Sequence, residues 1–149
     1  MNTKPHTKDI ASQVANACAC NALRRAARKV SRLYDNALKP AGIKNTQLTM
    51  LSAVALQKDV TLTALADSLA MERTTLLRNL APLEKNGWIK VSAEGYRRTR
   101  TVDLTAKGNK VLQDALPLWK TAQESIRKKM GGKDLDVLSA ELKRLAAVI

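Results

Sequence analysis

The apolar residues of this chain recur at helical spacing almost throughout and switch to strict alternation in one short stretch. Helical spacing runs through residues 10–38, 46–56, 62–69, 71–86, 105–130 and 134–148. Alternation begins at Ile89 and Val91 and resumes at Val102 and Leu104, with a turn over residues 94–98 between the two arms. Leu, Ala and Val dominate the apolar residues and Phe is absent, which favours helices over sheet. The sequence therefore predicts a mainly α fold with one small β-hairpin.

Short polar residues and a glycine mark the ends of several of these helices. Asn45 or Thr46 can cap the second helix, because a side-chain acceptor there satisfies a free backbone N–H of the first turn. Thr61 can cap the third helix, and Thr105 can cap the long helix after the hairpin. Gly87 can adopt the left-handed conformation that ends many helices, so we expect the fourth helix to stop there.

The fourth helix, over residues 71–86, has an unusual polar face. Leu76, Leu80 and Leu83 form its apolar stripe. The opposite face carries short polar groups and a guanidinium, the groups that read base edges in a major groove. We predict that this helix is a recognition helix whose DNA-binding residues are Thr74, Thr75, Arg78 and Asn79.

Pro82 lies inside the same helical pattern. Proline lacks a backbone N–H, and its ring crowds the carbonyl four residues earlier. We interpret Pro82 as bending or splitting the helix beyond the part that enters the groove. A kink that the helix tolerates, with no role in DNA binding, is the equal alternative.

The hairpin carries three arginines, Arg97, Arg98 and Arg100, at its tip and on its return arm. Arginine suits the negative potential of a narrow minor groove, so we predict that these side chains bind DNA beside the recognition helix. The alternative is an edge hairpin that charge protects from aggregation. Two short helices followed by a basic hairpin predict a winged helix-turn-helix.

The charge balance agrees with a polyanionic partner. The chain has 149 residues, with 26 Lys and Arg against 13 Asp and Glu, and a formal net charge of +13. Such a balance favours nucleic acid, although a basic protein without such a partner is the alternative. No long apolar run or secretory signal is present, so we expect no membrane association and a cytoplasmic location.

Three segments together resemble the MarR family of bacterial transcription regulators: residues 23–51, 62–89 and 96–108. The resemblance implies one MarR-like domain over 1–149, with the winged helix-turn-helix at about 46–104. It also implies a homodimer built by helices at about 10–38 and 105–149, and a small-molecule pocket beside them. Candidate pocket residues are Leu48, Leu51 and Trp119, although apolar residues at such spacing are more often plain core. Tyr96 replaces the aspartate of the family's wing, whereas Arg97 and Arg98 match its arginines.

The apolar terminal helices support a dimer independently of the resemblance. Leu135, Leu138, Leu142 and Leu145 recur along the last helix, which we expect to bury them. Two separate amphipathic helix sets are hard to bury in so small a monomer.

Two cysteines, Cys18 and Cys20, lie in the first helical pattern. In a helix their side chains point about 200° apart, so we expect no disulfide between them. The segment Cys20-Asn21-Ala22-Leu23 resembles that of organic hydroperoxide sensors of the OhrR type, which implies a redox role for Cys20. The alternative is that both thiols are small buried hydrophobes. One His and two Cys predict no metal site.

These observations predict a dimeric, sequence-specific DNA-binding regulator, a repressor released by a small-molecule ligand. Its DNA site is an inverted repeat in double-stranded DNA, with half-sites about 10 bp apart. The alternatives are a thiol-based peroxide-sensing regulator that uses Cys20 and a low-specificity DNA-binding protein. No base accompanies the cysteines, so we expect neither an enzyme nor a cofactor.

Overall fold

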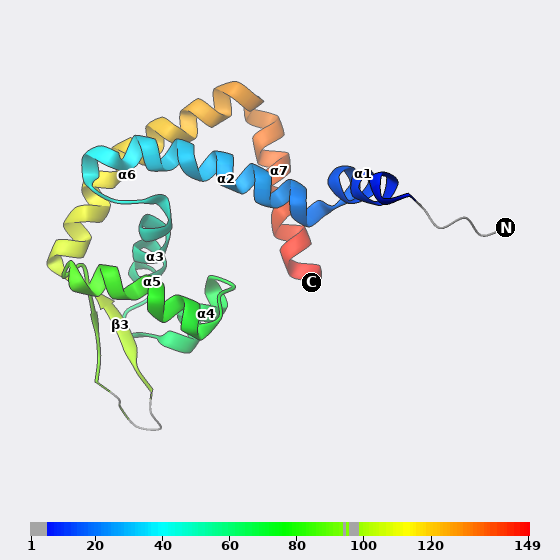
Figure 1. Cartoon of the computed structure of the whole chain (residues 1–149). Helices are drawn as coiled ribbons and strands as arrows, with labels where there is room; N and C mark the ends of the chain where they lie inside the picture. The colour runs from blue at the N-terminus through cyan, green and yellow to red at the C-terminus, as the bar shows by residue number, and fades with distance from the viewer. Residues whose placement is uncertain (1–5, 94, 96–98) are drawn as a thin grey trace. The chain divides into compact units, whose positions relative to one another are not determined.

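The computed structural model describes residues 6–93, 95 and 99–149 (Figure 1). The chain forms two compact units, Met1–Leu33 and Tyr34–Ile149, which are described separately. Among the described residues, no helix combines the length and the apolar character needed to cross a bilayer.

The first unit contains α1, Thr7–Ala17, and most of α2, Ala19–Leu38. Cys18 separates the two helices with an extended backbone, at φ −75° and ψ 107°. The prediction of one helix over residues 10–38 was therefore wrong. Neither proline nor glycine marks the break, so the apolar pattern carries no sign of it.

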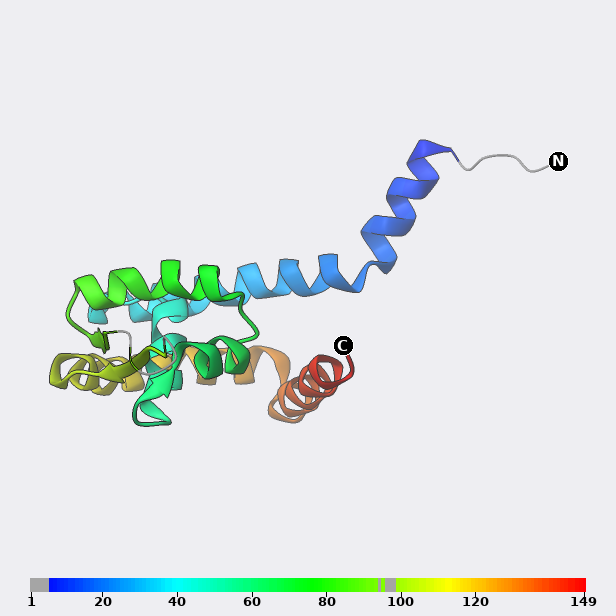
Figure 2. The ribbon, with the colours of Figure 1, turned by 90° about the horizontal axis from the view of Figure 1, so that it is seen from below.

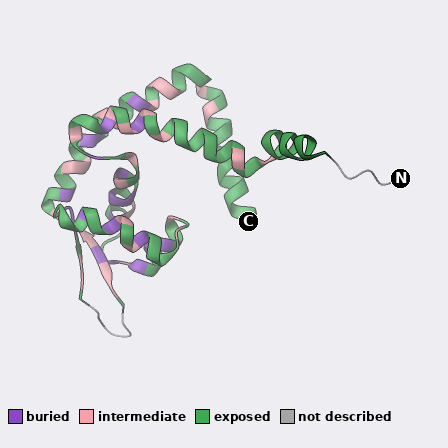
Figure 3. Ribbon diagram, viewed as in Figure 1, coloured by how far each residue is buried: buried purple, intermediate pink, exposed green. Residues whose placement is uncertain are grey.

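The second unit packs three helices and a small sheet around one core. The helices are α3 (Asn45–Ala55), α4 (Leu62–Ser68) and α5 (Arg73–Lys85), and a short 3₁₀ turn, η1 (Lys39–Ala41), precedes them. Buried residues gather where these elements meet (Figure 3). The side chains with no exposed surface are Leu38, Leu51, Leu65, Leu76, Leu83, Val102 and Ala115.

The sheet has three antiparallel strands in the order β1-β3-β2. The strands β2 (Ile89–Val91) and β3 (Thr101–Leu104) form the predicted hairpin, with Val91 opposite Val102. The strand β1 (Val60–Thr61) pairs with the other edge of β3. The sequence did not predict β1, because two residues are too few to show alternation.

Two of the predicted helix caps are confirmed. The Thr61 hydroxyl accepts the N–H of Ala64 at 3.1 Å, and the Thr105 hydroxyl accepts the N–H of Gly108 at 3.0 Å. Gly87 has a φ of 70°, which confirms the left-handed stop after α5.

The predicted cap of α3 was wrong. The helix begins at Asn45 itself, after Lys44. The Lys44 N–H donates to the side-chain oxygen of Gln47 at 2.9 Å, and the Asn45 N–H donates to the Asp35 carboxylate at 2.7 Å. One acceptor thus comes from a residue ten positions earlier, which local cap rules do not consider.

Pro82 does not split α5, which is one unbroken helix along its length (Figure 2). The proline is exposed, on the side opposite the buried stripe of Leu76, Leu80 and Leu83. A carbonyl left without its helical partner on that side can bond to water, which offsets part of the cost of the proline.

The long helix α6, Ala106–Met130, is followed at Gly131 by α7, Gly132–Val148. The expected burial of leucines on α7 was wrong for the single chain. Leu138 and Leu142 are each 40% exposed and Leu145 is 38% exposed. The predicted helix is present, and its residues are mostly exposed (Figure 3).

Candidate nucleic-acid interface

A tight turn joins α4 to α5 and sets the geometry of a helix-turn-helix. Ala70 adopts a φ of 49°, which is uncommon for a residue with a side chain. Its N–H donates to the Asp67 carbonyl at 3.1 Å, and the Met71 N–H donates to the Ala66 carbonyl at 2.9 Å. These bonds reverse the chain between the two helices.

The polar face of α5 lies where the sequence predicted it. Thr74, Thr75 and Arg78 are exposed, whereas Leu76 and Leu80 on the other face are at most 2% exposed. Asn79 is half-buried, and its amide donates to the sulfur of Met71 at 3.9 Å. Asn79 is therefore the least accessible of the four predicted residues.

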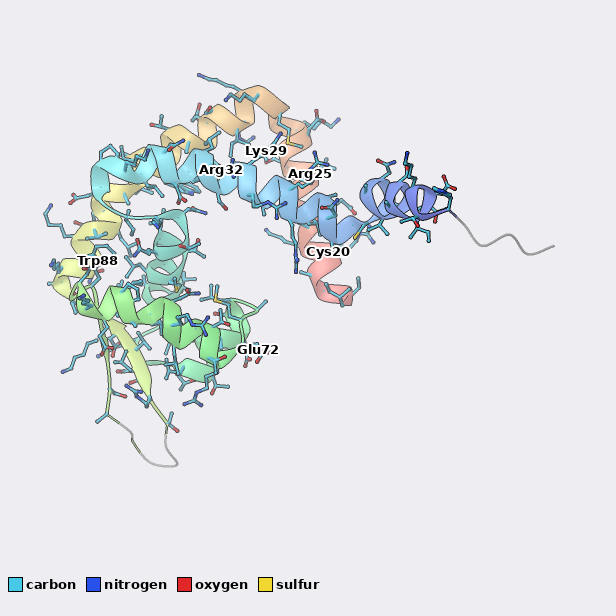
Figure 4. All side chains as sticks on the ribbon, in the orientation of Figure 1. Cys20, Arg25, Lys29, Arg32, Glu72 and Trp88 are labelled. Atoms are coloured by element: carbon cyan, nitrogen blue, oxygen red, sulfur yellow. The ribbon has the colours of Figure 1, made fainter. Side chains whose placement is uncertain are left out.

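Arg73 is a further exposed cation on α5 that the sequence reasoning passed over. It is the first residue of the helix and directly follows the capping position, Glu72, which Figure 4 labels. The signal that could have found it is its basic side chain beside Thr74 on the predicted recognition helix.

Of the predicted wing residues, Arg97 and Arg98 lie outside the described residues, as does Tyr96. Arg100 is half-buried, and its Nε donates to the Ser92 carbonyl across the hairpin at 3.2 Å. The Ser92 hydroxyl accepts the N–H of Thr101 at 2.8 Å, and the Ser92 N–H donates to the Thr101 carbonyl at 2.9 Å. Ser92 thus joins the two arms of the hairpin by hydrogen bonds, and Arg100 uses one of its N–H donors within the wing.

The start of α6 holds the base of the wing. Gly108 lies so close to the Trp88 carbonyl that a Cβ at Gly108 would stand 2.0 Å from that oxygen. The Thr105 hydroxyl donates to the Gly87 carbonyl at 2.6 Å. Trp88, labelled in Figure 4, is 8% exposed. The hairpin is therefore fixed against α6 through backbone contacts that require glycine.

Two carboxylates meet at the turn before β1. The N–H of Asp59 donates to the Asp103 carboxylate at 2.7 Å, and Asp59 has a φ of 52°. A side-chain hydrogen bond with Asp103, together with repulsion from its charge, raises the pKa of Asp59 above its ordinary value. This contact joins the turn before β1 to strand β3 of the wing.

A cavity of about 790 Å³ opens within the second unit, between α3, α4 and α6. Its apolar wall includes two of the three predicted pocket residues, Leu48 and Trp119, and also Leu112 and Leu116. The third, Leu51, is not part of the lining, because it is fully buried in the core.

The cysteines lie at the junction of α1 and α2, and neither forms a disulfide. Cys18 is half-buried, and Cys20, which Figure 4 labels, is exposed. Because Cys18 lies outside both helices, the separation of about 200° expected for two thiols in one continuous helix does not apply. Within the described part of the chain, no group of three His, Cys, Asp or Glu side chains could hold a metal ion.

Comparison with solved structures places this architecture among DNA-binding regulators. The transcriptional regulator MosR of M. tuberculosis, solved in complex with DNA, is 37% identical, with a TM-score of 0.80 over 88% of this chain and 95% of that chain. MarR from E. coli, complexed with operator DNA, is 19% identical with a TM-score of 0.78 over 89% and 96% of the two chains. BpsR of Bordetella bronchiseptica is 18% identical with a TM-score of 0.77 over 88% and 95%.

No family model and no curated protein matches the chain. The matched structures are those of transcription regulators, which confirms the prediction that the protein is not an enzyme. The fold class is confirmed as well, since the helices and the three-stranded sheet of the described residues match the winged helix-turn-helix of these structures. At 37% identity over nearly all of MosR, the chain belongs to the MarR family of DNA-binding transcription regulators.

Proposed function

We propose that the protein is a dimeric, sequence-specific repressor that a small-molecule ligand releases from DNA. The observation that carries this proposal is the exposed polar face of α5, in a chain 37% identical to a regulator solved on DNA. Thr74, Thr75 and Arg78 supply methyl groups, hydroxyls and a two-donor fork, which together can discriminate between base pairs.

The proposed contacts divide into two classes. Arg78 reads a guanine in the major groove, because its guanidinium matches the two acceptors of that base. Arg73, at the start of α5, binds phosphate, while Arg97, Arg98 and Arg100 bind the adjacent minor groove or its phosphates. The first class sets sequence preference, and the second sets affinity and its dependence on salt.

The open apolar faces of the terminal helices support the dimer. Val137, Leu138, Leu142, Leu145 and Val148 are 38 to 70% exposed on α7. Exposed apolar surface of this kind marks interfaces in soluble proteins. Two copies joined by two-fold symmetry would present their α5 helices to two half-sites one DNA turn apart.

The cavity supports release by a ligand. It lies between α3 and α4 of the winged helix-turn-helix and α6, which continues into the proposed dimer region. DNA binding of BpsR, which shares this fold, is regulated by 6-hydroxynicotinic acid. A ligand that prefers a dimer with the wrong spacing between α5 helices lowers DNA affinity by its differential binding.

Selection of bound duplexes from a random DNA pool tests this proposal. The reduced protein at about physiological salt should enrich an inverted repeat with half-sites one turn apart. A pool that stays random despite tight binding at low salt would instead identify a low-specificity DNA-binding protein.

A second candidate, peroxide sensing, is favoured by the position of the cysteines. Cys20 is exposed to solvent, and Cys18 lies at a break between helices rather than inside one. A hydroperoxide would oxidise the Cys20 thiolate to a sulfenic acid and release the corresponding alcohol. Peroxide should then abolish DNA binding by the wild type but not by Cys20→Ser. Equal loss, or no loss, in both proteins removes this candidate.

A further inference from the structure

The cavity of the second unit has polar side chains in its wall but no charged one. Each polar group is a neutral hydroxyl or amide: Asn45, Thr49, Ser52, Gln57, Ser68 and Gln113. The hydroxyls of Thr49 and Ser68 already donate to the carbonyls of Asn45 and Leu65, at 3.0 and 2.9 Å. The amide groups can both donate and accept, which suits a neutral polar group on a ligand.

The N-terminus of α3 lies beside the cavity and could hold an anion, but the Asp35 carboxylate already occupies it. Asn45 begins α3, and the N-terminus of an 11-residue helix carries partial positive charge. The Asn45 N–H donates to the Asp35 carboxylate at 2.7 Å, however. Asp35 therefore offsets the partial positive charge of this helix end, which leaves it unavailable to a second anion.

The net charge of +13 alone would suggest the opposite preference. That field attracts anions over about one Debye length, roughly 8–10 Å, and repels cations. Inside an apolar cavity, however, a carboxylate loses its hydration and needs a cation or several donors in return. Among the described residues, the lining supplies neither a cation nor a carboxylate, so a charged ligand of either sign is disfavoured.

We propose that this cavity selects an uncharged, mostly apolar ligand, and that Asp35 disfavours carboxylates there because it already occupies the start of α3. This inference rests on the proposed function, in which occupancy of the cavity governs DNA binding. The volume of about 790 Å³ is in the range of pockets that enclose small organic molecules.

Three probes of one shape and different charge test the ligand class. They are 1-naphthaleneacetamide, 1-naphthaleneacetate and 2-(1-naphthyl)ethylamine, titrated calorimetrically into the full-length protein at about physiological salt. The neutral amide should bind on the order of tenfold more tightly than either ion. Equal or tighter binding of an ion, or no binding of the amide at its solubility limit, would overturn the proposal.

Variants of the wall test the assigned residues. Asp35→Asn keeps an acceptor for the Asn45 N–H and removes the charge, so the preference for the amide over the acetate should narrow several-fold. Ser52→Arg places a guanidinium in the wall and should reverse that preference. Ala81→Arg adds the same charge at an exposed position on α5, outside the lining and away from Asp35 in the sequence, and should leave the order unchanged. If the two arginine variants show the same ratio of amide to acetate affinity, the probes bind outside the cavity and the proposal fails.

A DNA-binding assay with the same probes separates this inference from the proposed function. An amide that binds the cavity without changing DNA affinity would contradict release by a ligand and leave the ligand class intact. Release of DNA by the acetate at lower concentration than by the amide would contradict the ligand class and leave release intact.

Discussion

At the scale of single residues, helical spacing alone separates the polar and the apolar face of α5. Leu76 and Leu80 are buried, and Thr74, Thr75 and Arg78 are exposed, as the spacing requires. It did not show that Asn79 bonds to Met71, nor that Arg100 bonds to Ser92 across the hairpin. Both contacts depend on how separate segments meet.

Arg78→Ala should relax sequence preference and weaken binding to the selected duplex by about 1–3 kcal/mol, because one bidentate base contact is lost. Lys85→Ala, which removes one charge near the other end of α5, is the matched control and should leave preference unchanged. Competition binding against a randomised half-site measures both. Wild-type preference in Arg78→Ala would show that α5 does not read bases through this residue.

Asp59→Asn should stabilise the protein at neutral pH. The raised pKa of Asp59 means that the folded state binds its proton more tightly than the unfolded chain does. In the wild type, the stabilisation from protonated Asp59 is fully present below the ordinary pKa of 3.8. It is lost as the pH rises through the raised pKa, because the ionised carboxylates of Asp59 and Asp103 then repel each other. Asn also tolerates the positive φ at this position.

Urea unfolding of Asp59→Asn and wild type, from about pH 3.5 to pH 7, measures this difference. The advantage of the variant should grow as pH rises. An advantage that is constant across this range would contradict the assigned repulsion between the two carboxylates.

At the scale of elements, the sequence predicted the helix ends that depend on one residue's own side chain or backbone angle. Thr61, Thr105 and Gly87 mark helix ends through their own side chains or φ angles, and all three are confirmed. The cap of α3 and the strand β1 were missed, because Asp35 and β3 reach them from distant positions. The break at Cys18 has no local residue that explains it.

Gly108→Ala should destabilise the protein by about 1–3 kcal/mol, because its Cβ would collide with the Trp88 carbonyl and force the wing away from α6. Helix propensity alone predicts the opposite sign, a gain of up to about 1 kcal/mol. Lys107→Ala, at the exposed neighbouring position, is the control. Thermal unfolding decides between the two signs, and a stabilised Gly108→Ala would rule out the close contact.

At the scale of the whole molecule, the sequence predicted the apolar stripe of α7 but not the exposure of its leucines. Periodicity identifies which residues share a face and says nothing about what covers that face. The exposed leucines of α7 are the main structural support for a second copy of the chain.

Leu142→Glu should shift the protein from dimer to monomer, since a carboxylate would be buried without a partner at the proposed interface. Lys143→Glu, the neighbouring exposed position on α7, should remain dimeric. Sedimentation equilibrium over a range of concentrations measures the dissociation constants. Identical constants for Leu142→Glu and wild type would place the interface elsewhere.

In the proposed function, two joined copies of the chain bind two half-sites one DNA turn apart. The most direct test of this arrangement is the affinity of the wild-type protein for the selected duplex and for a version with 5 bp inserted between the half-sites. The insertion turns one half-site to the opposite face of the DNA, so affinity should fall by more than about tenfold. Equal affinity for the two duplexes would contradict a dimer of fixed spacing.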